Sequence, residues 1–221
     1  GSLHAVADLL AAVIHRDRTG EGQQIDISMT DCVFSLNAMA GAACLAAGEE
    51  PGLESTLLNG GSFYDYYATR DGRWMAVGSL EPQFLNVLCQ TLGRPELASV
   101  GLSATKEHRQ RLKTGLSEAF LQADFAHWCE VFAAVDACVE PVLSLPEAAQ
   151  HPQLAARGLV QSVPVGGSEQ AQMACPIVFG SGLAAPRHGG KALGEDTERI
   201  LRTLGLTEQE ITALRAARAV N

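Results

Sequence analysis

The chain has 221 residues, of which 47% are apolar and 19% are charged, and its formal net charge is −9. This length allows one large domain or two small ones with a sizeable core. The acidic balance argues against a nucleic-acid partner, which would require a basic face, but it is compatible with an anionic cofactor held by a few local Lys or Arg residues.

Cysteine usage and hydropathy favour a cytoplasmic protein. The six cysteines form no C-x-x-C pair and mostly lie in apolar stretches, so we expect reduced cysteines that act as small core residues. No spacing of His, Cys, Asp and Glu indicates a metal site. No signal peptide is evident, and no uncharged apolar run reaches the roughly 18 residues of a membrane span. We therefore expect no membrane partner.

The first fifty residues predict helices separated by a polar loop. Apolar residues at helical spacing predict a helix over Leu3–His15, with Ser2 as a plausible cap. The segment Arg16–Gln23 predicts a loop, which lacks the Lys-Ser/Thr ending of a P-loop. Gln24–Met29 alternates as a short strand does. Cys32–Ala47 predicts an apolar helix that is buried or lies at an interface.

Turn-forming and aromatic residues are most concentrated in residues 59–84, which follow a short linker. Ser62–Thr69 and Arg73–Gly78 predict two strands, and the Asp-Gly between them favours a hairpin. A short loop, Ser79–Glu81, then leads to Pro82, which suits the first position of a helix. The carboxylate of Glu81 therefore lies where a strand passes into a helix. Such carboxylates do chemistry in many enzymes and cap helices in many more.

The rest of the chain predicts mostly helices. The predicted ranges are Pro82–Leu92, Ser103–Leu121 with a solvated charged face, Asp124–Ala134 with Asp124 as cap, Thr197–Leu204, and Thr207–Ala217 with a Thr207/Glu210 capping box. Ser144 predicts the cap of a further short helix that ends at His151-Pro152.

Strands are few in this part of the sequence. Val139–Leu143 predicts a strand that Pro141 confines to an edge or a bulge. Leu159–Val165 and Gln172–Phe179 predict a second hairpin. There is no internal repeat and no regular strand–helix alternation, so the order predicts a mixed α/β fold without a complete doubly wound sheet.

Four separated blocks resemble the C-terminal part of the CaiB/BaiF-type, or class III, CoA-transferases. They read RDRTGEGQQIDISMTD, FYDYYATRDGRWMAVGSLEPQF, DACVEPVLSLPEAAQHPQLAARG and LGEDTERIL. Within this superfamily they are most similar to the α-methylacyl-CoA racemases. The resemblance implies a family III fold in which a small α+β domain (residues 51–143) is inserted in a larger domain (residues 1–50 and 144–221). It also implies an interlocked homodimer.

The resemblance further implies chemistry on an acyl-CoA, with coenzyme A as part of the substrate and no covalently bound cofactor. A racemase moves the α-proton of a 2-methylacyl-CoA and needs an acid/base group on each face of the carbon. The family's catalytic histidine and aspartate precede the residues of this chain, so we expect another chain or an N-terminal half to supply them, and we expect this chain alone to be inactive.

Three residues match site positions of the family. Glu81 matches a glutamate that partners the catalytic histidine, and the alternative is that it serves only the helix dipole. Tyr64 and Leu80 match the acyl pocket, and the alternative is a half-buried hairpin face. His4 lies on an apolar helix and could act as a base. A structural role as a partly buried helix histidine is the favoured interpretation.

Two further functions stay open. One is CoA transfer from an acyl-CoA to a carboxylic acid, although the loop GSLEPQF lacks the longer Gly-rich segment of well-known transferases. The other is a non-catalytic assembly role, since the apolar helices would expose a large apolar surface without a partner.

Overall fold

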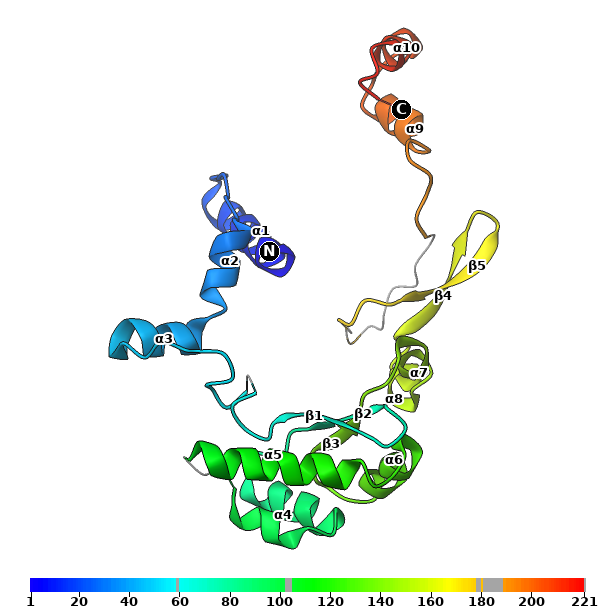
Figure 1. Ribbon diagram of the computed structural model, residues 1–221. Helices are drawn as coiled ribbons and strands as arrows, with labels where there is room; N and C mark the ends of the chain where they lie inside the picture. The colour runs from blue at the N-terminus through cyan, green and yellow to red at the C-terminus, as the bar shows by residue number, and fades with distance from the viewer. Residues whose placement is uncertain (59, 102–104, 178–179, 181–188, 221) are drawn as a thin grey trace. The chain divides into compact units, whose positions relative to one another are not determined.

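The computed structural model describes residues 1–58, 60–101, 105–177, 180 and 189–220. The chain divides into two compact units, Gly1–Val142 and Leu143–Asn221. The first contains three N-terminal helices and a three-stranded sheet with its own helices, and the second contains a β-hairpin and short helices (Figure 1). The division into residues 1–50, 51–143 and 144–221 stays a prediction.

The chain begins with α1 (Ser2–Thr19), α2 (Met29–Ser35) and α3 (Ala38–Ala47). Helix α1 ends at Thr19 and not at His15, so it includes the polar residues that we expected to form a loop. The helix stops at Gly20, whose φ of 80° is easily adopted by glycine. Ser2 is inside this helix and is not its cap. The strand predicted over Gln24–Met29 is wrong, because these residues pair with no described strand and Met29 already begins α2.

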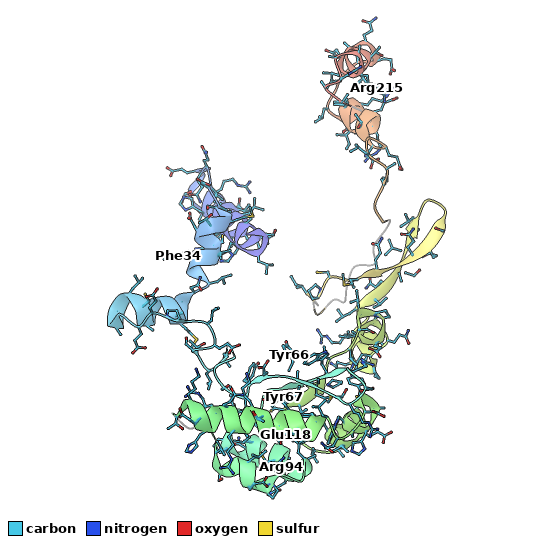
Figure 2. The ribbon with its side chains drawn as sticks, in the orientation of Figure 1. Phe34, Tyr66, Tyr67, Arg94, Glu118 and Arg215 are labelled. Atoms are coloured by element: carbon cyan, nitrogen blue, oxygen red, sulfur yellow. The ribbon has the colours of Figure 1, made fainter. Side chains whose placement is uncertain are left out.

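The helix predicted over Cys32–Ala47 is broken between α2 and α3. The Asn37 side chain donates to the Val33 carbonyl at 3.0 Å and so competes with the helical backbone at the break. Phe34, labelled in Figure 2, is 72% exposed, and the only buried residue in the two helices is Cys32. Within the described residues no single helix is long and apolar enough to cross a membrane, whereas α2 and α3, bent by 72°, meet that test only together.

The hairpin prediction is confirmed. Strands β1 (Asp65–Ala68), β2 (Trp74–Val77) and β3 (Val139–Pro141) form an antiparallel sheet in the order β1-β2-β3. Tyr67 faces Met75 and Val77 faces Val139, and these four side chains are buried on one face. Pro141 lies on the edge strand, where a missing N–H is tolerated.

Four helical segments accompany this sheet: α4 (Pro82–Thr91), the short 3₁₀ helix η1 (Pro95–Ser99), α5 (Lys106–Phe120) and α6 (Phe125–Ala133). Helix α5 contacts β1, and α6 contacts β2 and β3 (Figure 1). Residues 103 and 104, where we expected α5 to begin, lie outside the described residues. The aromatic rings of Tyr67, Phe120, Trp128 and Phe132 form the centre of the core, with centroid distances from 5.4 to 5.9 Å.

The turn of the hairpin caps α6. Asp124 occupies the N-cap position as predicted, but its carboxylate makes no capping bond and instead accepts two hydrogen bonds of 2.8 Å from Arg70. The Asp71 carboxylate accepts the amide N–H of Phe125 at 3.0 Å. A capping side chain therefore comes from a residue 54 positions earlier in the chain, and it ties the hairpin to α6.

The second unit comprises α7 (Leu145–Ala149), α8 (Pro152–Ala156), β4 (Val160–Val165), β5 (Ser168–Met173), α9 (Thr197–Thr203) and α10 (Glu208–Ala216). Capping boxes start α7 at Ser144 and α10 at Thr207. Helix α8 was not predicted. Strand β5 begins directly after the glycine turn and not at Gln172, and residues 178–179 of the predicted strand lie outside the described residues.

No disulfide joins any of the six cysteines, all of which are described, but they do not all belong to a core. Cys32 and Cys89 are buried and Cys129 is half-buried, as expected for small apolar residues. The prediction is wrong for the three exposed cysteines, which are Cys44, Cys138 and Cys175. Apolar sequence neighbours do not place a side chain inward when its own element leaves that face uncovered.

Candidate functional site

The loop that joins β2 to α4 carries the candidate residue Glu81. Pro82 is the first residue of α4, and Glu81 occupies its N-cap position with an extended backbone (φ −74°, ψ 141°). The Glu81 carboxylate is exposed and makes no capping hydrogen bond to the helix. A negative charge at this end still favours the helix dipole, by roughly 0.3–1 kcal/mol in general. The side chain is thus available for an interaction outside its own helix.

Tyr64 lies next to the start of this loop. It immediately precedes β1 and is 40% exposed. A Cβ atom added to Gly78 would lie 3.5 Å from Cε2 of Tyr64, so the tyrosine ring passes over this glycine. Leu80, two residues further on, is half-buried, and its N–H donates to the Gly78 carbonyl at 2.8 Å. The structure therefore brings Tyr64 to the loop that carries Leu80 and Glu81.

A cavity of about 540 Å³ adjoins this loop. Tyr64 and Gly78 line it together with Cys138 and Glu140 from the β3 side, whereas Leu80 and Glu81 are not among its lining residues. Sequence reasoning missed Cys138 and Glu140. The strand pairing that brings them here joins residues about 60 positions apart, and the only local signal was the edge-strand proline that follows them.

The electrostatic field on this side is negative. The pKa of the Cys138 thiol is raised, first by partial desolvation and then by the carboxylates of Asp136, Glu81 and Glu140. Glu81 therefore acts on the cavity wall although it does not line the cavity. The thiol is accordingly kept in its neutral form, which is the unreactive one.

Asp65 is a lining carboxylate with a cationic partner. Burial raises its pKa, but a hydrogen bond from Lys113, the amide N–H of Tyr66 and the charge of Lys113 outweigh burial and lower the pKa below 3.8. The Lys113 Nζ atom lies 2.8 Å from Asp65 Oδ2 and also donates to the Gly60 carbonyl at 3.1 Å. This ion pair fixes the start of β1, next to Tyr64, to helix α5.

The histidines lie away from this loop in sequence. His4 is half-buried on α1 and lines a separate cavity of about 280 Å³ with Asp8, Asp26 and Cys32. His151 caps α8, since its Nδ1 atom accepts the Gln153 N–H at 3.2 Å. Among the described residues, no group of three or more His, Cys, Asp or Glu side chains could hold a metal ion.

Comparisons with known proteins place these elements in one family. The profile of CoA-transferase family III matches residues 1–197. The human alpha-methylacyl-CoA racemase is 30% identical over all of this chain and 57% of its own length, and the acetyl-CoA:oxalate CoA-transferase of Acetobacter aceti is 28% identical over 72% of this chain and 42% of its own length.

The fold agrees with these similarities. A crystal structure of a CaiB/BaiF family protein from Brucella suis superposes with a TM-score of 0.70 at 24% identity, covering 91% of this chain and 53% of that one. The chain thus spans about half of these relatives, and its mixed α/β architecture corresponds to their C-terminal portion. The chain belongs to CoA-transferase family III.

Proposed function

We propose that this chain forms part of an enzyme that acts on acyl-CoA thioesters and moves the α-proton of a 2-methylacyl-CoA, as a racemase does. The observation that carries the proposal is the exposed Glu81 carboxylate, which lies at the N-terminus of α4 and makes no capping hydrogen bond there, with Tyr64 beside the same loop. The 30% identity to a racemase over the whole chain supports it. Coenzyme A is then part of the substrate.

The chemistry explains the role of Glu81. A thioester makes the α-proton acidic and lets the intermediate be an enolate, and inversion requires one acid/base group on each face of the carbon. The resemblance assigns these groups to a histidine and an aspartate in the part of the family's sequence that precedes the residues matched here. A carboxylate beside the imidazole fixes its tautomer and stabilises the imidazolium. Tyr64 and Leu80 would contact the acyl group.

The partners follow from the same assignment. The histidine and aspartate must come from the same enzyme's N-terminal half or from a second copy in a homodimer. Exposed apolar side chains on α2 and α3, such as Phe34 and Met39, would be covered in that assembly. A cytoplasmic location stays a prediction.

CoA transfer to a carboxylic acid is the second candidate function, because relatives with this activity match as well. In that reaction the aspartate acts as a nucleophile and forms anhydride and thioester intermediates. The loop from Gly78 to Glu81 is short, because it joins β2 directly to α4. It therefore lacks the longer Gly-rich segment that the resemblance associates with transferases. This short loop favours proton transfer.

An isotope experiment separates the two reactions. The full-length protein is incubated in deuterated water with one enantiomer of a 2-methylacyl-CoA, with and without a carboxylic acid acceptor. We expect deuterium at the α-carbon without any acceptor. Acceptor-dependent CoA transfer with no exchange would replace the racemase assignment by a transferase. The absence of both reactions would support a non-catalytic assembly role.

A further inference from the structure

We propose that Ser79 is a positioning residue for Glu81. Its buried hydroxyl ties the loop between β2 and α4 to the segment that precedes β3, and it thereby fixes where the Glu81 carboxylate can meet its partner. This inference rests on the proposed function, because it presupposes that Glu81 partners the catalytic histidine.

The loop is tied by a set of short hydrogen bonds. Ser79 is 0% exposed, and its Oγ donates to the carbonyl of Ala137 at 2.5 Å. The N–H of Gly78 donates to the carbonyl of Cys138 at 2.8 Å, and the N–H of Leu80 turns back to the Gly78 carbonyl at 2.8 Å. Two consecutive loop residues thus bind two consecutive carbonyls on a segment about 58 residues away.

The segment that accepts these bonds is held by burial at Ala137 and by the strand pairing that follows it. Cys138 has a φ of 51°, in the left-handed region that residues other than glycine rarely adopt. Ala137 is 2% exposed, and β3 begins at the next residue after Cys138 and pairs with β2. The Ala137 carbonyl is therefore a fixed anchor for the Ser79 hydroxyl.

Glu81 depends on this anchor because its own side chain has no local one. The carboxylate is exposed and makes no capping bond, so only the backbone on either side locates it. On the helix side, the Glu81 carbonyl accepts a hydrogen bond from the Leu85 N–H at 3.0 Å. On the strand side, the hydrogen bond from the Ser79 hydroxyl to the Ala137 carbonyl holds the loop. A carboxylate–imidazole hydrogen bond tolerates only about 2.6–3.2 Å, so a displaced loop weakens it.

The test is a double-mutant cycle in the full-length protein with α-proton exchange as the readout. Ser79→Ala should lower kcat roughly tenfold with little change in KM, since a misplacement near 1 Å can cost up to about 100-fold. It should also shift the histidine limb of the pH profile downward, in the direction of Glu81→Gln, because the imidazolium loses its carboxylate. In the Glu81→Gln background, Ser79→Ala should have no further effect.

Two variants control for folding. Thr69→Val removes another buried hydroxyl, at 1% exposure in the hairpin turn, and should leave the pH profile unchanged. Ser79→Cys retains a weak donor, and its kcat should lie between wild type and Ser79→Ala. It serves as the test variant if Ser79→Ala does not fold.

The outcomes are distinct. Equal effects of the Ser79 change with and without Glu81, or a pH profile like that of wild type, would overturn the positioning role and leave the proposed function intact. An unimpaired Glu81→Gln would overturn both the partner role of Glu81 and the inference built on it.

Discussion

Replacement of Phe120 by Ala tests whether the aromatic cluster holds the hairpin against α5. Phe120 is 0% exposed, and its ring centroid lies 5.4 Å from those of Tyr67 and Trp128 and 5.8 Å from that of Phe132. Truncation of a buried phenylalanine costs about 3–5 kcal/mol, and each aromatic pair contributes about 0.5–1.5 kcal/mol beyond area burial. Because three such pairs are lost at once, we expect the upper part of that range.

Intrinsic fluorescence makes the measurement local. The two tryptophans, Trp74 on β2 and Trp128 on α6, both lie in the sheet-and-helix part of the first unit, so a urea titration followed by fluorescence reports its unfolding. The matched control is Leu121→Ala, because Leu121 is adjacent in sequence and 47% exposed. It should change the free energy of unfolding by about 1 kcal/mol or less. Equal urea midpoints for the two variants would show that the aromatic cluster does not hold the hairpin against α5.

Two further predictions concern the same part of the chain. Gly115→Ala should destabilise it by about 1–3 kcal/mol despite the better helix propensity, because the new Cβ would lie 2.8 and 2.9 Å from the methyl carbons of Leu97, and that side chain is only 2% exposed and must move within the packed core. A variant that is more stable in urea would contradict this packing. The folded-state pKa of Asp65 lies below 3.8, so its contribution is present above that pH and is lost as the pH falls through the folded value. Asp65→Asn should therefore make the free energy of unfolding fall less steeply as the pH is lowered below about 4. The same pH dependence as in wild type would show that the pair with Lys113 is not stabilising.

Local signals in the sequence predicted the hairpin and the helix that follows it. The Asp-Gly turn and Pro82 act on their immediate neighbours, and the structure has both features where the pattern places them. The alternation of polar and apolar residues over Gln24–Met29 predicted a strand that the structure does not contain. A strand needs a partner, and none of the described strands pairs with this segment. The break at Asn37 was missed because side-chain competition with the helix backbone leaves the apolar pattern intact.

The candidate site was predictable only in part. Glu81, Tyr64 and Leu80 could be named from the sequence and its resemblance, whereas the contacts around them depend on pairings across the chain. The Ser79–Ala137 bond spans 58 residues, and the cap that Asp71 provides to α6 spans 54. No periodicity within a single element carries that information.

The role of Glu81 is tested by comparing two glutamate variants of the full-length protein in the deuterium-exchange assay. Glu81→Gln removes the proposed partner of the histidine, while Glu118→Gln removes an exposed carboxylate on α5, 3.8 Å from Arg94 (Figure 2). We expect Glu81→Gln to slow α-proton exchange at least about tenfold, because the carboxylate that orients a catalytic imidazole is lost, and we expect Glu118→Gln to react near the wild-type rate. Equal exchange rates for both variants and wild type would contradict this role of Glu81.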